Sequence, residues 1–243
     1  MKICVAQIRP QKGAIETNLQ RHIELIRVAI SHEVDIIIFP ELSLSSYEPT
    51  LAQDLAKEAD DVQLSIFQDL SDTHQITIGI GVPTRTQNGI CISMIIFHPY
   101  QARQVYSKKY LHEDELPFFV NGQNDSVVIK AFPHMALAIC YELSIPEHAQ
   151  NAHRHHAQVY IASVAKTAEG VQKASKQLSH IASQYNMTVL MSNCVGYCDD
   201  FESAGQSAVW NQEGCLLGQL DAVSEGILVI DTETQAVFSS ILV

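Results

Sequence analysis

Glutamate, lysine and cysteine side chains stand at the ends of apolar runs in this sequence, where they could do chemistry. Glu41 follows three isoleucines, Phe39 and Pro40, so its carboxylate is expected to be partly desolvated and suited to proton transfer. Cys140 ends another apolar run at a predicted strand-to-helix turn, where a thiol can act as a nucleophile. Lys108 or Lys109, after a predicted strand end, could stabilise an oxyanion. Taken singly, each has a simpler interpretation: a strand-end residue, a core cysteine or a solvated loop.

Strands and helices that alternate along the chain must position these residues. Apolar, β-branched runs predict strands at 3–8, 34–39, 75–82, 126–130, 135–140, 159–163 and 188–193. Apolar spacings of three and four predict helices at 14–32, 51–70, 146–156 and 168–185. Asn88-Gly89 predicts a hairpin, and strands at 206–210, 215–219 and 226–230 are expected to form a final meander. The pattern predicts a single α/β domain over 1–243, with two sheets packed together and helices outside.

The composition excludes several classes of function. The 243 residues carry a net charge of -12 and no dense basic patch, which disfavours nucleic-acid binding. No apolar run approaches the roughly 20 residues that cross a bilayer, and the first residues do not resemble a secretory signal. The cysteines are scattered rather than spaced as a disulfide framework. We therefore expect a cytoplasmic protein that binds neither membrane nor nucleic acid.

Three stretches taken together resemble the carbon–nitrogen hydrolase (nitrilase) superfamily, in its amidase-like branch. They are residues 39–47 (FPELSLSSY), 106–111 (YSKKYL) and 139–147 (ICYELSIPE). In that family a glutamate follows an apolar strand, a lysine comes later, and a cysteine closes a further strand. Similar stretches at 5–7, 192–196 and 205–209 extend the resemblance over nearly the whole chain. The resemblance implies an αββα four-layer sandwich, with two mixed β-sheets packed face to face and helices outside.

The resemblance also implies a Glu-Lys-Cys triad. Family members place the lysine three residues before a leucine, which selects Lys108 by its spacing from Leu111. Cys140 would form a thioester with an amide substrate, while Glu41 would serve in turn as general base and acid. Lys108 and the backbone N–H of Tyr141 would receive the negative charge of the oxyanion.

Further residues are expected around this triad. Glu115 is the best match to an acidic residue that the family carries in the loop after the lysine, and Glu113 is the alternative. Substrate-binding or supporting places are also expected for Glu142, Ser163 and Asn193.

Three positions depart from common members of the family. Ser144 and Cys194 stand where many members carry arginine, and residues 163–165 lack an aromatic side chain that often occurs there. These positions are expected near the pocket. The resemblance therefore predicts the reaction of this chain better than it predicts the substrate.

The rival interpretations concern metals and cofactors. Four histidines could share a predicted helix, namely His148, His153, His155 and His156. No suitably spaced carboxylate or cysteine completes a set of metal ligands, so the default interpretation is a histidine-rich helix surface. Cys194 and Cys198 do not have the spacing of a redox or zinc pair. We expect neither a metal nor a cofactor.

The expected function is cofactor-free hydrolysis of a carbon–nitrogen (amide) bond in a small molecule. The alternatives are an N-carbamoyl amide hydrolase, a nitrilase or an N-acyltransferase of the same family, or a catalytically silent relative that binds small molecules. The resemblance implies a homodimer or a higher homo-oligomer. The identity of the substrate stays open.

Overall fold

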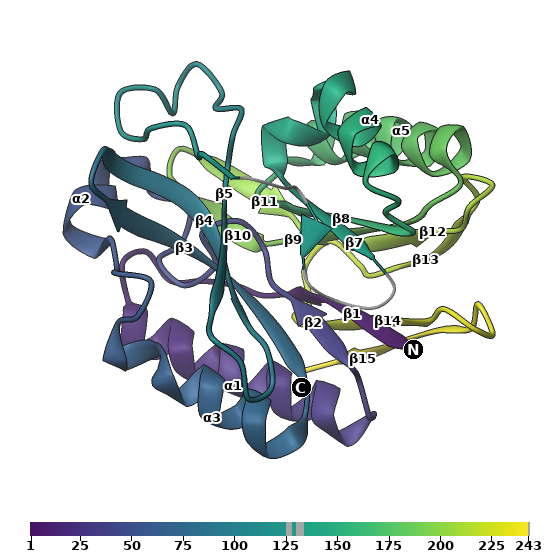
Figure 1. Ribbon diagram of the computed structural model, residues 1–243, viewed down its shortest axis with the longest axis horizontal. Helices are drawn as coiled ribbons and strands as arrows, with labels where there is room; N and C mark the ends of the chain where they lie inside the picture. Colours follow the sequence, from purple (N-terminus) through teal and green to yellow (C-terminus); the bar gives the residue numbers. More distant parts are fainter. Residues whose placement is uncertain (125–127, 130–133, 243) are drawn as a thin grey trace.

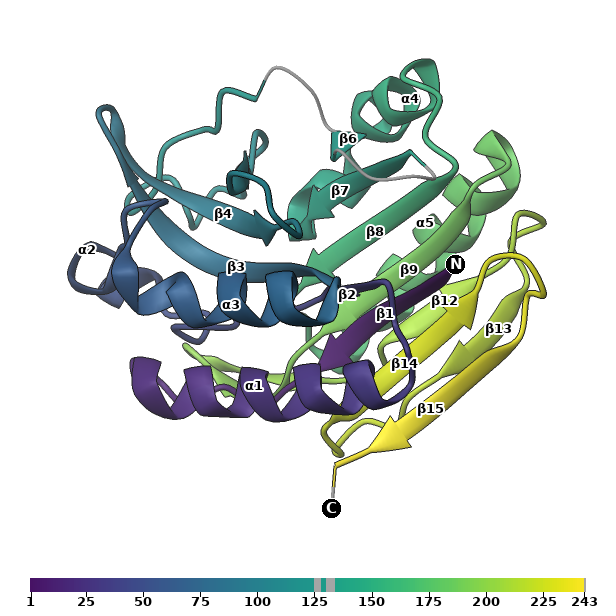
Figure 2. The ribbon, with the colours of Figure 1, turned by 60° about the horizontal axis from the view of Figure 1, so that its bottom comes forward.

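The computed structural model describes residues 1–124, 128–129 and 134–242. In this part of the chain, two large β-sheets pack face to face and helices cover their outer faces (Figures 1 and 2). The predicted αββα four-layer sandwich is confirmed.

The first sheet combines parallel and antiparallel pairs. β1, β2 and β3 are parallel neighbours, whereas β4, β5, β14 and β15 join by antiparallel pairing. In spatial order its described strands are β15 (Val237–Ile241), β14 (Gly226–Asp231), β1 (Lys2–Gln7), β2 (Ile36–Ile38), β3 (Thr77–Thr86), β4 (Gly89–Phe97) and β5 (Gln104–Ser107).

The second sheet also has a parallel centre and antiparallel edges. β7, β8 and β9 are parallel, and a separate hairpin of β10 (Val195–Cys198) and β11 (Phe201–Ala204) follows β9. In spatial order the described strands are β13 (Leu216–Gln219), β12 (Ala208–Trp210), β9 (Thr188–Asn193), β8 (Val159–Val164), β7 (Met135–Ile139) and β6 (Val128–Ile129).

The longer helices form the outer layers (Figure 2). α1 (Ile15–Ser31) and α3 (Ser65–His74) lie on the first sheet, and α4 (Pro146–Arg154) and α5 (Ala168–Tyr185) lie on the second. Shorter helical turns are η1 (Pro49–Leu51), α2 (Ala52–Leu55), η2 (Val62–Leu64) and η3 (Cys140–Ser144).

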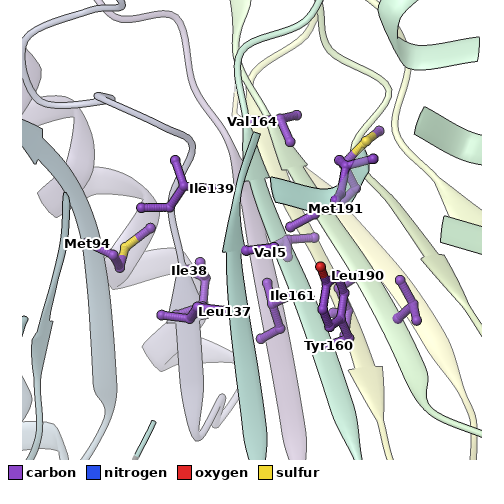
Figure 3. Packing of buried hydrophobic residues seen from close by; sticks show 14 of the residues in the cluster. Val5, Ile38, Met94, Leu137, Ile139, Tyr160, Ile161, Val164, Leu190 and Met191 are labelled. Carbon is purple, nitrogen blue, oxygen red and sulfur yellow. The ribbon is translucent and has the colours of Figure 1, made fainter. Parts of the chain in front are cut away.

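Alternation along the strands of the first sheet divides their side chains between two apolar clusters. Ile36 and Ile38 of β2 belong to the cluster between the sheets, which Figure 3 shows from close by. Ile37 belongs instead to the cluster beneath α1 and α3. Because side chains on a strand point to opposite faces in turn, a run of three isoleucines can fill both layers.

Two local predictions need correction, and a third falls partly outside the described residues. The helix predicted at 51–70 is interrupted, because the Lys57 N–H donates to the Pro83 carbonyl and the Lys57 carbonyl accepts from the Arg85 N–H, both in β3. β14 does not continue a meander with β13, but pairs with β1 in the other sheet. Of the strand predicted at 126–130, the structure shows Val128–Ile129 as β6, and the rest lies outside the described residues.

The strands that precede the candidate residues end at one side of the sandwich. β5 runs in the direction of β3, because two antiparallel steps through β4 restore the direction. β7, β8 and β9 are parallel neighbours in the facing sheet. The carboxyl ends of such strands are where α/β folds build ligand sites.

Candidate active site

Glu41 lies in a tight turn that passes over β3. The backbone N–H of Leu44 donates to the Gly81 carbonyl, with an N···O distance of 3.0 Å. A Cβ on Gly81 would lie 2.2 Å from the Pro40 carbonyl oxygen, so glycine is required for this close approach. Leu42 completes the turn with a left-handed φ of 49°. The turn leaves only 1% of Glu41 exposed.

Lys108 is fully buried between two carboxylates. Its Nζ donates to Glu41 Oε1 at 2.7 Å and to Glu115 Oε1 at 2.5 Å. The residue follows β5, and its backbone is fixed because its N–H donates to the Ile92 carbonyl and its carbonyl accepts from the Gly122 N–H. One cation thus joins two acidic residues that are far apart in the sequence.

Glu115 is itself held by two donors besides Lys108. The Tyr47 hydroxyl donates to Glu115 Oε1 at 3.0 Å, and the His112 N–H donates to Oε2 at 2.8 Å. Of the two alternatives from the sequence, Glu115 lies against Lys108, while Glu113 is exposed.

Cys140 begins η3 directly after β7. Its φ of 44° lies in the left-handed region, which is uncommon for a residue other than glycine, so the chain bends sharply at the thiol. Cys140 is partly exposed and lines the same pocket as Lys108. The structure therefore brings Glu41, Lys108 and Cys140 together from three separate stretches.

Burial and charge act in opposite directions on the cluster. Burial raises the pKa of Glu41, although the Lys108 ammonium opposes this effect. Burial would lower the pKa of Lys108, but the negative charges of Glu41, Cys140 and Glu115 outweigh it and raise that pKa. Burial and the charge of Glu41 raise the pKa of the Cys140 thiol. At neutral pH the arrangement favours a neutral thiol and a protonated lysine.

One oxygen of this cluster is left open. Glu41 Oε1 accepts from Lys108, whereas the buried Oε2 of Glu41 has no hydrogen-bond partner among the described residues. A buried acceptor without a partner costs free energy unless a ligand or a transferred proton satisfies it. Glu41 is thus equipped to accept a proton.

The pocket at this edge has a volume of about 460 Å³. Several of its lining residues were not singled out from the sequence as site residues. They are Tyr47, His112, Asp114, Ala165, Lys166, Thr167, Gly170, Asp199, Asp200 and Phe201. Lys166 could have been found by the rule used for Lys108, because it closely follows the buried strand β8.

The other expected residues fall into two groups. Tyr141 lines the pocket, as does Ser144. Ser163 and Asn193 are fully buried and bond to the backbone: Ser163 Oγ donates to the Phe39 carbonyl at 2.8 Å, and Asn193 Nδ2 donates to the Gly205 carbonyl at 2.7 Å. These two contacts support the loops around the pocket.

Glu142 is buried beside the pocket rather than in its lining. It accepts hydrogen bonds from the Ile139 N–H at 2.8 Å, the Tyr106 hydroxyl at 2.7 Å and the Lys109 N–H at 2.6 Å. Burial raises its pKa to about 7 in spite of these donors. Glu142 therefore connects the turn before Cys140 to the loop after Lys108.

The four histidines in and just after α4, which ends at Arg154, do not form one surface group. His153, His155 and His156 are exposed as expected, but His148 is buried and was wrongly assigned to the surface by default. Its ring bonds to the Tyr106 hydroxyl through Nε2 and to the Tyr160 hydroxyl through Nδ1, at 2.9 Å each. Within the described ranges, no three His, Cys, Asp or Glu side chains are grouped as metal ligands.

Comparisons with known proteins place the chain in a family. The sequence profile of the carbon-nitrogen hydrolase family matches residues 2–238. A glutamine-dependent NAD(+) synthetase of Acinetobacter baylyi is 27% identical over 233 residues, which cover 92% of this chain but 42% of that protein. An (R)-stereoselective amidase of Pseudomonas sp is 25% identical over 150 residues, covering 60% of this chain and 54% of the relative. The chain thus spans less than half the length of the synthetase that it matches.

Solved structures agree on the fold. A mutant of the amidase from Nesterenkonia sp. AN1 has a TM-score of 0.86 at 20% sequence identity, and the match covers 95% of this chain and 92% of that chain. At this identity the likeness concerns the fold. Among the described residues, no helix is both long and apolar enough to cross a membrane. With its fold, its site geometry and the profile match in agreement, the chain belongs to the carbon–nitrogen hydrolase family.

Proposed function

We propose that this protein hydrolyses the amide bond of a small molecule through a thioester on Cys140, without a cofactor. The observation that carries the proposal is the buried Lys108 between Glu41 and Glu115, at the base of a pocket that Cys140 also lines. A structural ion pair does not require an open carboxylate oxygen beside a cysteine at a sharp turn. A catalytic site requires both, because the open oxygen can accept the proton of the thiol.

The first half of the reaction forms the acyl-enzyme. Glu41 takes the proton of the Cys140 thiol as the sulfur attacks the amide carbon. The oxyanion that develops is stabilised by the Lys108 ammonium and the backbone N–H of Tyr141. Collapse of the tetrahedral intermediate breaks the C–N bond, and Glu41 returns the proton to the departing amine or ammonia.

The second half releases the acid. A water molecule loses a proton to Glu41 as its oxygen attacks the thioester carbon, and the C–S bond breaks. The proton on Glu41 then passes to the Cys140 sulfur, which regenerates the thiol. Glu115, held by Tyr47, keeps Lys108 in position through both halves.

The matched relatives that act on amides support an amide substrate. One solved structure is of a mutant of the Nesterenkonia amidase in complex with butyramide, and several matched relatives are glutamine-dependent NAD(+) synthetases. An N-carbamoyl compound, a nitrile or an acyl-accepting amine would use the same thioester. A silent relative that binds small molecules would have no need for the Cys140 thiol. We also propose, from the family, a cytoplasmic homodimer or higher homo-oligomer.

Ammonia release from a panel of small amides, N-carbamoyl compounds and nitriles tests the proposal. We expect Cys140→Ala to lower turnover of the best amide by about 1,000-fold or more, because the nucleophile is lost. Cys215→Ala is the matched control, since Cys215 is exposed and lies outside the pocket. Intact-mass spectrometry of a quenched reaction should show the acyl adduct on the wild type but not on Cys140→Ala. Unchanged turnover in Cys140→Ala would refute the mechanism.

A further inference from the structure

Lys166 is a second lysine of the pocket, and its backbone is fixed from several directions. It follows β8 and lines the cavity with Cys140. Its N–H donates to Asn193 Oδ1 at 2.9 Å, and its carbonyl accepts from the Ala204 N–H at 2.9 Å. The Ser203 hydroxyl also donates to that carbonyl at 3.2 Å. The start of the Lys166 side chain is therefore held at one place on the pocket wall.

The two lysines of the pocket differ in their charge partners. Lys108 lies between two carboxylates, which compensate its charge. For Lys166, no carboxylate lies within 4 Å of the ammonium in the part of the chain that the structure describes, and the residue is half-buried. The Lys166 ammonium opposes the burial that raises the pKa of Cys140, so its charge reaches the thiol. A partly desolvated cation in a cavity is a natural partner for an anionic ligand group.

We propose that Lys166 binds a carboxylate on the acyl part of the substrate, so that the preferred substrate is a small amide bearing a carboxylate at the far end from the scissile bond. The inference rests on the proposed function and adds the substrate class to it. With the amide carbon at Cys140, the carboxylate lies against the wall formed by Lys166. Its distance from the amide is set by the span between these two residues.

The acidic side of the same pocket limits the substrate to one carboxylate. Asp114, Asp199 and Asp200 also line the cavity. Asp114 is already bonded to the His112 ring at 2.6 Å. Burial and the neighbouring charge of Asp200 raise the pKa of Asp199, which shows that negative charge is already crowded there. A second carboxylate would be repelled, whereas an ammonium group beside the first would be accepted.

Three amides of similar length test the proposal. Pentanamide is neutral, glutaramate carries a carboxylate at the far end, and 5-aminopentanamide carries an ammonium there. We expect the wild type to favour glutaramate over pentanamide by about 10-fold or more in kcat/KM, as for a charge-assisted hydrogen bond. Lys166→Met should remove this advantage mainly through KM, and Lys166→Arg should restore part of it. Lys166→Glu should shift preference toward 5-aminopentanamide.

Matched controls separate the possible outcomes. Lys173→Met removes an exposed lysine that pairs with Glu169 on α5 and should leave the ratios unchanged. An equal fall for pentanamide and glutaramate in Lys166→Met would mean that Lys166 serves the chemistry, and would overturn the proposal. A wild-type preference for 5-aminopentanamide, or no change in Lys166→Met, would overturn it as well.

Binding provides a measurement that does not depend on turnover. Calorimetric titration of glutaramate into Cys140→Ala and into the Cys140→Ala/Lys166→Met double variant should show about 10-fold weaker binding to the double variant. If the wild type turned over no amide, the proposed function would fail, while this difference would still support the carboxylate contact. Equal affinities would refute the contact even in an active enzyme.

Discussion

Two buried carboxylates near the pocket, Glu41 and Glu142, differ in how completely they are satisfied. Both are almost fully inaccessible to solvent. Glu142 accepts three hydrogen bonds, two of them from backbone N–H groups. Glu41 accepts from the Lys108 ammonium, and its second oxygen has no partner among the described residues. A saturated carboxylate is suited to hold structure, and an open one is suited to exchange protons.

Each carboxylate belongs to a cluster: Glu142 and its donors form the closed cluster, and Glu41, Lys108 and Cys140 form the open cluster. The two clusters nevertheless depend on each other. Glu142 accepts from the N–H of Ile139, which precedes Cys140, and from the N–H of Lys109, which follows Lys108. It therefore fixes the backbone of the candidate nucleophile relative to that of the candidate oxyanion donor. The closed cluster positions what the open cluster uses.

The largest expected effect comes from Glu41→Gln, which keeps the shape of the side chain but removes the base. Amide turnover should fall by about 1,000-fold or more, because proton transfer is lost in both halves of the reaction. Thermal stability should change little, since Lys108 keeps its contact with Glu115. Turnover within about 10-fold of the wild type would show that Glu41 is not the general base.

Glu142→Ala should show the opposite profile, with its main effect on stability. Two buried donors and the part-buried Lys109 N–H would lose their acceptor, and we expect a loss of about 3–5 kcal/mol in the free energy of unfolding. Guanidinium unfolding monitored by circular dichroism measures this loss. The control is Glu147→Ala, because Glu147 is exposed at the start of α4. A loss below about 1 kcal/mol would mean that Glu142 does not hold the two loops together.

The difference between these carboxylates also marks what sequence could and could not predict. The end of the Ile36–Ile38 strand and the end of β7 were visible as apolar runs, so Glu41 and Cys140 could be placed at sheet edges. The family resemblance then supplied Lys108 and the sandwich. The hydrogen bonds of Glu142 could not be predicted, because its donors come from residues 30 or more positions away as well as from its own turn.

Errors in the local predictions have the same origin. The helical period at 51–70 was real, but β2 is short and leaves the end of β3 open to pairing with Lys57. His148 looked like a surface residue because its tyrosine partners, Tyr106 and Tyr160, lie on β5 and β8. Lys166 lies in no motif that the sequence analysis recognised. Tertiary contacts decided each of these cases, and local patterns do not contain them.

The closed cluster should also have a distinctive response to acid. Burial lowers the pKa of His148 to about 4, below its unfolded value of 6.5. Its contribution to stability is therefore complete above pH 6.5 and is lost as pH falls through 4, because the unfolded chain binds the proton first. Burial raises the pKa of Glu142 to about 7, from 4.5, so its contribution is complete below pH 4.5 and is lost as pH rises through 7.

His148→Gln separates these opposing contributions. Relative to the wild type, the variant should gain up to about 3 kcal/mol of unfolding free energy as pH falls from 7 to 4. Denaturant unfolding at a series of pH values gives the difference. His180→Gln removes an exposed histidine of α5 and serves as the control. A difference independent of pH would mean that His148 takes up its proton as readily in the folded chain as in the unfolded one.

The smallest effect concerns two buried serines that cross from the second sheet to the first. Ser163 Oγ donates to the Phe39 carbonyl, two residues before Glu41, and Ser192 Oγ donates to the Ala6 carbonyl at 2.6 Å and the Ile38 carbonyl at 3.1 Å. Each alanine variant should cost about 1 kcal/mol of stability, as the loss of a buried hydrogen bond does.

Their effects on turnover should differ. Ser163→Ala loosens the segment that leads directly into the Glu41 turn, so kcat should fall by a few-fold, about 1 kcal/mol at most, with KM unchanged. Ser192→Ala should leave kcat near the wild-type value, because its bonds end on strands β1 and β2, which their sheet neighbours also hold. Steady-state kinetics on the best amide compares the two variants. Equal losses of kcat would show that the open carboxylate is sensitive to the packing of the two sheets as a whole rather than to the support of its own turn.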